Sequence, residues 1–230
     1  MLEMQSISKS YGSKQVLSNA SFHMRKGEIA GVMGPSGEGK STIARILCGT
    51  VAPDSGSVFF ENELLTKAGQ SFNKKLRTAI QLIPQQPFAS LDPRQTVGKA
   101  IEEPLLFHRI VKSRAEAKSR ALSLMERMLL DRRLYERRPG ELSGGQAQRV
   151  LIVRSLTVSP RLLIADEATS MLDVSAQSEV MRLLTDLSRQ DGLAVLIISH
   201  DDTLVKSMAD TIYRLSNGKL TNAKQMEETQ

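Results

Sequence analysis

The stretch that most restricts the fold of this chain is Glu28–Leu47, "EIAGVMGPSGEGKSTIARIL". Its first six residues are typical of a buried strand, and "KSTIARIL" has the three- and four-residue apolar spacing of an amphipathic helix. Between them, "GPSGEG" holds glycines that permit a tight loop. A strand that passes through a glycine-rich loop into a helix is typical of α/β proteins, in which helices cover a mainly parallel sheet.

Other segments indicate how the sheet continues. The apolar runs "LLIA" and "LAVLIIS" show no polar alternation, which is typical of strands buried on both faces of a parallel sheet. From Gly144 onward, helical and strand-like segments alternate. Residues 1–30 predict short strands joined by turns, and Pro53–Leu65 predicts a turn leading into an edge strand. Residues 88–142 change to helices and loops, so we expect an α/β core interrupted by an inserted helical lobe.

Composition is that of a soluble globular protein, with 40% hydrophobic and 24% charged residues among 230. No window approaches 18 uninterrupted apolar residues, so we expect no segment to span a bilayer. The N-terminus, "MLEMQSISKSYGSK", lacks the apolar centre of a secretory signal. Cys48 is the single cysteine, which excludes an internal disulfide and fits a reducing cytosol. Its apolar neighbours predict a packed thiol rather than a catalytic one.

The net charge of +6 is compatible with a nucleic acid or an anionic membrane face as partner. The densest basic stretches, "HRIVKSRAEAKSR" and "DRRLYERR", have helical spacing, and a solvated helix face is the simpler interpretation of both. Only 4% of the residues are aromatic and none is Trp. Stacking platforms for single-stranded nucleic acid are therefore scarce.

The segment Gly34–Ser41, "GPSGEGKS", matches the pattern G-x-x-x-x-G-K-[ST]. Backbone N–H groups of such a loop wrap around phosphates, and the helix N-terminus adds its positive end. We expect Lys40 to reach the β- and γ-phosphates and the Ser41 hydroxyl to hold Mg²⁺. The alternative is a chance glycine-rich turn, which the preceding strand and the following helix both oppose. The pattern therefore favours a nucleotide site.

A second acidic site is needed to organise the metal, and "LLIADE" supplies Asp166 and Glu167 at a strand end. We expect Asp166 to bind Mg²⁺ through water and Glu167 to orient or polarise the attacking water. Two adjacent acids there are otherwise equally consistent with a cap on the next turn. His200 ends the next apolar strand, where it can contact the γ-phosphate. His23 and His108 lack such a context and are expected to be surface or packing residues.

The pentapeptide "LSGGQ", Leu142–Gln146, stands at the head of a predicted helix. Ser143 and the N–H groups of Gly144 and Gly145 are expected to form a second anion nest. One phosphate loop already cradles a triphosphate, so a second nest is most useful if it serves the nucleotide of another subunit. An ordinary Ser-Gly helix cap is the alternative interpretation.

Taken in order, these motifs resemble those of the nucleotide-binding subunits of ATP-binding cassette transporters, over essentially the whole chain. In that resemblance "GPSGEGKS" is the Walker A loop, "LLIAD" the Walker B strand, "LSGGQ" the signature, and "SMLD" the D-loop, with Met171 where alanine is usual. The ATP contacts that it implies are Tyr11, Gly34, Pro35, Ser36, Gly37, Glu38, Gly39, Lys40, Ser41 and Thr42 and, toward the ATP of the other subunit, Ser143, Gly144, Gly145, Gln146 and Asp173. The residues that it assigns to Mg²⁺ are Ser41, Gln85 and Asp166, and those that it assigns to catalysis are Gln85, Glu167 and His200.

The resemblance also implies the fold: a P-loop NTPase (RecA-like) core with an N-terminal antiparallel β-subdomain and an inserted α-helical subdomain. Residues 1–87 and 144–230 are expected to form the core and β-subdomain, and 88–143 the helical signature subdomain, within one ABC ATPase domain. Two such subunits are expected to pair head to tail, the other being a paralogue. They would bind two transmembrane permease subunits at the cytoplasmic face of the membrane, serve a substrate-binding protein indirectly, and bind no nucleic acid.

The segment Ile83–Leu105 narrows the subfamily. Its run "Q-x-P-x-x-S-L-x-P-R-x-T-V", followed by "EPL", resembles the ATPases of oligopeptide, dipeptide and nickel importers, and most closely the second of a heteromeric pair. Peptide-importing members often carry a longer C-terminal tail with a cysteine-containing motif. This sequence has no cysteine after Cys48, which favours nickel or a metal chelate as the cargo. We therefore expect an ATP-hydrolysing importer subunit. The alternative is a soluble, non-transport ABC ATPase of the translation or DNA repair type.

Overall fold

The computed structural model describes residues 1–170 and 172–223, which divide into two compact units. The first unit comprises Met1–Leu82, Arg161–Glu167 and the described residues from Thr185 onward; the second comprises Ile83–Pro160 and the described residues of Ala168–Leu184. The departure at Met171 lies outside the described residues. The domain boundaries at residues 88 and 143 stay a prediction.

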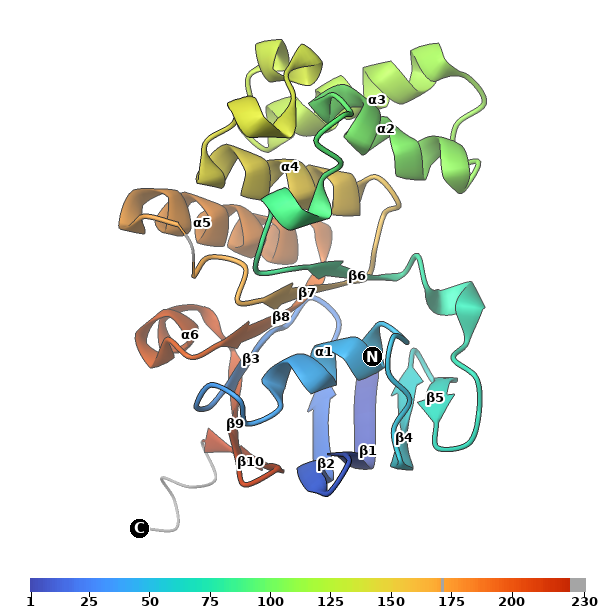
Figure 1. Cartoon of the computed structure of the whole chain (residues 1–230), viewed down its shortest axis with the longest axis vertical. Coiled ribbons are helices and arrows are strands. Elements are labelled where there is room, and N and C mark those ends of the chain that lie inside the picture. The colour runs from blue at the N-terminus through green and yellow to red at the C-terminus, as the bar shows by residue number, and fades with distance from the viewer. Residues whose placement is uncertain (171, 224–230) are drawn as a thin grey trace. The chain divides into compact units, whose positions relative to one another are not determined.

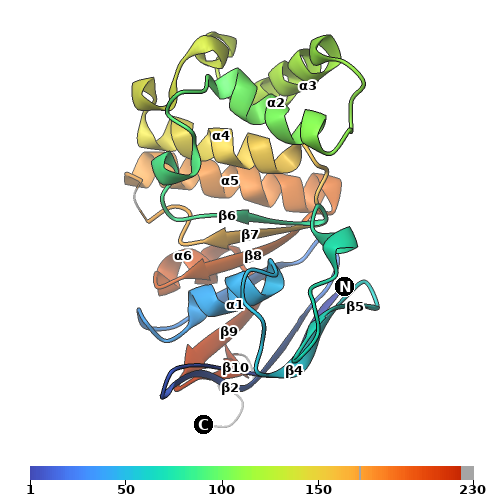
Figure 2. The same ribbon diagram turned by 45° about the vertical axis from the view of Figure 1, so that its right-hand side comes forward.

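The elements are drawn in Figures 1 and 2. The strands are β1 (Leu2–Tyr11), β2 (Lys14–Met24), β3 (Ile29–Met33), β4 (Ser55–Phe60), β5 (Glu63–Lys67), β6 (Ile80–Ile83), β7 (Leu162–Asp166), β8 (Ala194–Ser199), β9 (Thr211–Ser216) and β10 (Lys219–Asn222). The α-helices are α1 (Lys40–Leu47), α2 (Val97–Phe107), α3 (Arg114–Arg127), α4 (Gly144–Leu156), α5 (Val174–Asp191) and α6 (Asp202–Met208). Short 3₁₀ helices are η1 (Lys74–Leu76), η2 (Phe88–Ser90), η3 (Arg132–Glu136) and η4 (Pro139–Glu141).

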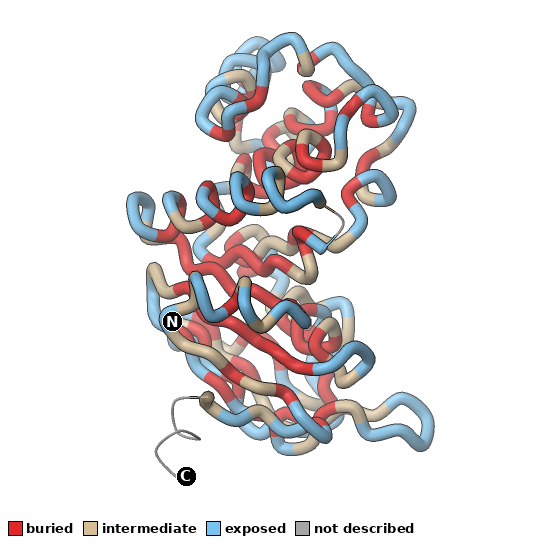
Figure 3. Tube along the Cα trace, turned by 90° about the vertical axis from the view of Figure 1, so that its left-hand side faces the viewer, coloured by how far each residue is buried: buried red, intermediate tan, exposed pale blue. Residues whose placement is uncertain are grey.

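A six-stranded sheet has the order β10-β9-β3-β8-β7-β6. Strand β3 pairs in parallel with β8 and β9, and β7 pairs in parallel with β8. Every residue of β3 and β8 is buried, as the continuous red stretches inside the sheet show in Figure 3. The interpretation of "LLIA" and "LAVLIIS" as buried parallel strands is confirmed. Because parallel strands end at the same edge, β3, β7 and β8 deliver the segments that follow them to one side of the sheet.

The second sheet is antiparallel, with the order β2-β1-β4-β5. The prediction of one edge strand over Pro53–Leu65 is wrong, because β4 pairs with β1 on one side and β5 on the other. The turn between β4 and β5 consists of Glu61 and Asn62, both with positive φ. Such a two-residue turn matches the twist of paired strands and closes a hairpin.

The core of the first unit is continuous between the two sheets and α1, and includes Leu17, Ile43, Phe60 and Leu196. Cys48 is half-buried and packs against this cluster. Burial raises the pKa of its thiol to about 12, which agrees with the predicted packing role.

The second unit is mainly helical. In α3 the buried residues Ala117, Ala121 and Met125 recur every four positions and form the stripe by which the helix packs. Ser113 caps α3, since its side chain accepts from the N–H of Glu116 at 3.1 Å. The Glu116 carboxylate reaches one residue further back than a capping box requires, to the N–H of Lys112 at 2.9 Å. Among the helices of the described residues, none combines the length and apolar character needed to cross a bilayer.

Candidate functional site

The loop between β3 and α1 depends on its glycines. Gly34 has a φ of 156°, and a Cβ there would lie 2.4 Å from the carbonyl oxygen of Leu215. Gly39 has a φ of 106°, and its Cβ would meet Val16 at 2.4 Å. No other residue fits either position without displacing backbone or packed side chains. Gly39 also begins α1 without a side-chain cap, so its first turn presents backbone N–H groups rather than a capping side chain.

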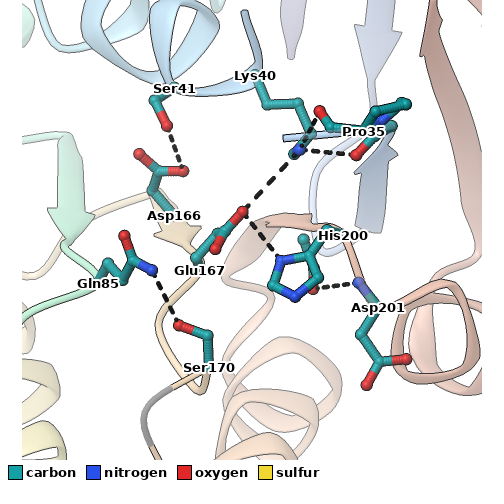
Figure 4. Close-up of polar contacts among 11 residues, drawn as sticks. Pro35, Lys40, Ser41, Gln85, Asp166, Glu167, Ser170, His200 and Asp201 are labelled. Carbon is teal, nitrogen blue, oxygen red and sulfur yellow. Dashed lines mark hydrogen bonds and ion pairs between the residues drawn. The ribbon is translucent and has the colours of Figure 1, made fainter. Parts of the chain in front are cut away.

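Lys40 is buried although its side chain is charged. Its ammonium group donates to the carbonyl oxygens of Gly34 at 2.7 Å and Pro35 at 2.9 Å. It also lies 3.9 Å from a carboxylate oxygen of Glu167. A buried cation needs such partners, and here they hold the ammonium group within the loop, as Figure 4 shows.

The other predicted residues of the loop differ in their surroundings. Ser36 and Gly37 are exposed, and a Cβ on Gly37 would meet no atom within 4 Å. Glu38 accepts a hydrogen bond from the N–H of Asn217 at 2.9 Å, which ties the loop to the turn between β9 and β10. Thr42 is buried in the first turn of α1. The open side of the loop is thus at Ser36 and Gly37.

Ser41 and Asp166 are 125 positions apart in the sequence and in contact in the fold. The Ser41 hydroxyl donates to Asp166 Oδ1 at 3.1 Å (Figure 4). Burial raises the pKa of Asp166, as does the adjacent Glu167, whereas the hydrogen bond from Ser41 and the cations Arg45 and Lys40 act in the opposite direction. A positive charge placed beside such a buried carboxylate would stabilise its ionised form.

Glu167, directly after β7, has a φ of 49°, a left-handed conformation that is uncommon for a residue with a Cβ. Its N–H donates to the carbonyl of Ile198 at 2.8 Å, which fixes the turn against β8. Its carboxylate lies 3.2 Å from Nδ1 of His200, and the side chains are 17% and 52% exposed, respectively. Unusual backbone at a functional site is maintained by its surroundings, and here it directs the carboxylate of Glu167 toward Lys40 and His200.

Tyr11 also belongs to the first unit. It ends β1 and is 44% exposed. The ammonium group of Lys9 lies 5.7 Å from the centre of its ring, so one cation–π contact holds the ring.

The remaining predicted residues lie in the second unit, beginning with Gln85. Its side-chain amide donates to Ser170 Oγ at 3.2 Å, a contact drawn in Figure 4. Ser170 was not predicted as a site residue. The signal for it in the sequence is its place in "SMLD", four residues after Asp166.

The residues "SGGQ" open α4, where Ser143 and Gln146 cap each other. Ser143 Oγ accepts from the N–H of Gln146 at 3.2 Å, and Gln146 Oε1 accepts from the N–H of Ser143 at 2.9 Å. Gly145 is buried, and a Cβ there would lie 3.0 Å from Ala176, whereas Gly144 is half-buried. The spacing Ser-x-x-Gln is itself a capping-box pattern, so the sequence carried this signal.

Asp173 lies just before α5 in the same unit. Its carboxylate accepts from the N–H of Ala176 at 2.9 Å, so it stabilises the first turn of that helix. Its side chain is exposed. The first unit thus brings together the glycine loop, Asp166, Glu167 and His200 and also contains Tyr11, and the second unit holds Gln85, the signature residues and Asp173.

Comparisons with known proteins agree on one family. Residues 17–170 match the ABC transporter family. The nickel import ATP-binding protein NikE of Escherichia coli (strain 536 / UPEC) is 39% identical over 205 residues, which cover 89% of this chain and 76% of that protein.

Two solved structures have the same fold. A dimeric ATP-binding cassette in a post-hydrolysis state, bound to ADP and Pi, has a TM-score of 0.84 and 31% identity over 96% of both chains. The protein cbiO1 from Clostridium perfringens, part of the ABC transporter complex cbiONQ, has a TM-score of 0.85 and 25% identity over 99% of this chain and 90% of its own. The predicted fold class, an α/β P-loop NTPase, is confirmed.

Proposed function

Because the chain belongs to the ABC transporter family, we propose that it is the ATP-hydrolysing subunit of an importer for nickel or a nickel chelate. The observation that carries the proposal is the 3.1 Å contact between Ser41 and Asp166. It joins the first turn of the helix after the phosphate loop to the aspartate that ends β7, the pair that holds Mg²⁺ in P-loop NTPases. The similarity to the nickel import protein NikE supports nickel over oligopeptides as the cargo.

ATP would be held by the glycine loop, with adenine against Tyr11. The N–H groups of the loop and of the first turn of α1 would surround the phosphates, and Gly34, Gly37 and Gly39 supply the conformation. Lys40 would exchange its contacts with the carbonyls of Gly34 and Pro35 for the β- and γ-phosphates.

The donor set fits Mg²⁺, because a serine hydroxyl and a carboxylate are hard oxygen ligands on facing elements. Their separation of 3.1 Å suits two neighbouring positions around a small ion. Ser41 would hold the ion directly, Asp166 directly or through water, and Gln85 would supply a third oxygen. When bound, Mg²⁺ neutralises charge on the phosphate oxygens.

Glu167 would orient the attacking water and accept its proton. His200 lies where its ring can hold one carboxylate oxygen of Glu167, which would fix the orientation of the carboxylate. Its remaining ring nitrogen would face the γ-phosphate. Catalysis here rests on positioning, since phosphoryl transfer asks little covalent chemistry of the protein.

Ser143, Gly144, Gly145, Gln146 and Asp173 would act on the ATP of a second ATPase subunit, in a head-to-tail pair. The dimeric cassette among the similar structures supports pairing. The other subunit would be a paralogue, and two permease subunits would complete the importer at the cytoplasmic face of the membrane. Gln85 begins the segment that would contact them, and its side chain is held by Ser170 of the same unit.

The test is to isolate the tagged chain from its host under mild detergent, identify its partners, and measure ATP turnover. We expect integral membrane proteins to co-purify and Glu167→Gln to abolish turnover. Glu63→Gln, which changes an exposed glutamate on β5 in the same way, serves as the control. Equal turnover in both variants contradicts the assignment of Glu167. A complex with ribosomes or DNA and no membrane protein establishes the non-transport alternative.

A further inference from the structure

The turn between α2 and α3 carries a cluster of charge that the proposed function does not use. We call Phe107–Arg114, "FHRIVKSR", the α2–α3 tip. It contains Arg109, Lys112 and Arg114 and no acidic residue. Figures 1 and 2 show it at the end of the two neighbouring helices.

The cations of the tip face solvent, and the Glu116 carboxylate at the tip accepts from the backbone N–H of Lys112 rather than from a cationic side chain. Arg109, Lys112 and Arg114 are all exposed, and in the part of the chain that the structure describes none of them forms an ion pair. Other cations of the same lobe are neutralised by the pairs Lys118–Glu136, Arg132–Glu126, Arg133–Asp131 and Arg137–Glu141. Unlike those four cations, the three cations of the tip keep their charge unpaired among the described residues.

An aromatic side chain stands beside these cations. Phe107 is 79% exposed, the most exposed aromatic side chain among the described residues. It borders a groove of about 460 Å³ whose other lining residues are Gln95, Lys99, Glu102, Glu103, Leu106 and Arg114. Its ring packs edge-on against that of His108, which is exposed as well. Burial of this ring against a partner would remove its apolar surface from water.

The backbone of the tip is fixed from within. Val111 packs in a small core with Leu105 and Ala117, and Ile110 lies against it. Glu116 binds the N–H of Lys112 through its carboxylate. The tip thus presents Phe107 and the three cations from a fixed backbone, so little backbone ordering is required on binding.

We propose that the α2–α3 tip binds the anionic phospholipids of a membrane surface. Cations near such a surface are attracted by its negative potential, and a single aromatic ring inserts at the level of the headgroups. The combination of three unpaired cations with one exposed phenylalanine fits this partner. Nucleotide binding and hydrolysis do not involve the tip, so the proposal stands or fails separately from the proposed function.

The test is co-sedimentation of the full chain with vesicles of phosphatidylcholine, with and without phosphatidylglycerol. We expect binding only to the vesicles that contain phosphatidylglycerol, and weaker binding as salt rises. The variant Arg109→Gln, Lys112→Gln, Arg114→Gln should bind about 100-fold more weakly, at about fivefold for each cation. Phe107→Ala should weaken binding by about tenfold, and salt should alter this deficit little.

The matched control is Lys74→Gln, Lys75→Gln, Arg77→Gln, which removes the same charge from exposed positions in and beside η1. ATP binding and thermal unfolding verify that every variant is folded. An equal loss of vesicle binding in both triple variants would overturn the proposal, because net charge alone would then explain it. Absent binding, or equal binding to neutral vesicles, would overturn it too and direct attention to an acidic protein segment as partner.

Discussion

Oε1 of Glu167 lies 3.2 Å from Nδ1 of His200 and 3.9 Å from Nζ of Lys40. One carboxylate oxygen therefore faces the residue after β8 and the first residue of α1. The left-handed backbone of Glu167 makes both approaches possible. The contact with His200 fixes the carboxylate that would orient the attacking water.

His200→Ala should lower ATP turnover about 100-fold, the scale of a lost proton-transfer or positioning group, while ATP affinity stays within a few-fold. Phosphate release by the purified complex and equilibrium nucleotide binding measure the two quantities. His108→Ala is the control, since that histidine is exposed in the second unit. A parallel loss of affinity in His200→Ala would contradict a role limited to catalysis.

Two glycines of the same loop should respond differently to substitution. Gly34→Ala places a Cβ 2.4 Å from the Leu215 carbonyl oxygen and should lower the free energy of unfolding by about 2–3 kcal/mol and weaken ATP binding. Gly37→Ala meets no atom within 4 Å, so it should cost only the backbone strain of about 1 kcal/mol. Chemical denaturation measures both, and equal costs would show that the crowding at Leu215 is unimportant.

Ser143→Arg should leave ATP binding to this subunit intact and reduce turnover of the complex by at least about 100-fold. The arginine removes the hydroxyl that accepts from the N–H of Gln146 and blocks the surface that would meet the other nucleotide. Ser123→Arg, at an exposed position of α3, provides the comparison. Normal turnover in Ser143→Arg would exclude a shared site.

The free energy of unfolding should decrease at alkaline pH because of the Cys48 thiol. Burial holds the pKa of its thiol at about 12 in the folded state, above the value of about 8.5 in an unfolded chain. The unfolded state therefore loses the proton first as pH rises, and the folded state loses stability above about pH 8.5, by at most about 1.4 kcal/mol per pH unit.

Urea denaturation of the wild type and Cys48→Ala at several pH values separates this effect from those of other groups. The wild type should show the steeper decline above about pH 8.5. Identical slopes would mean that the thiol ionises equally easily in both states.

The sequence was sufficient to predict those elements whose local residue pattern agrees with their place in the sheet. The strand, loop and helix over Glu28–Leu47, and the buried parallel strands β7 and β8, follow from apolar runs and glycine spacing. The contact between Ser41 and Asp166 follows as well, because the ends of parallel strands meet at one edge.

Contacts that depend on how far a side chain extends in the folded structure could not be predicted from the local residue pattern. Nothing in the local pattern pairs Gln85 with Ser170, which is 85 positions away. The hairpin of β4 and β5 was missed because Glu61 and Asn62 replace the Asn-Gly or Asp-Gly that usually marks such a turn. The reach of Glu116 to Lys112 instead of Ser113 likewise depends on the final geometry of the turn.

Uptake of labelled nickel tests the central claim most directly. Cells that carry Glu167→Gln in place of the wild-type chain are compared with cells that carry Glu63→Gln, with and without a metal-chelating carrier in the medium. The account predicts that uptake is lost in Glu167→Gln and retained in Glu63→Gln. Full uptake in cells with Glu167→Gln would contradict the claim that ATP hydrolysis by this chain energises nickel import.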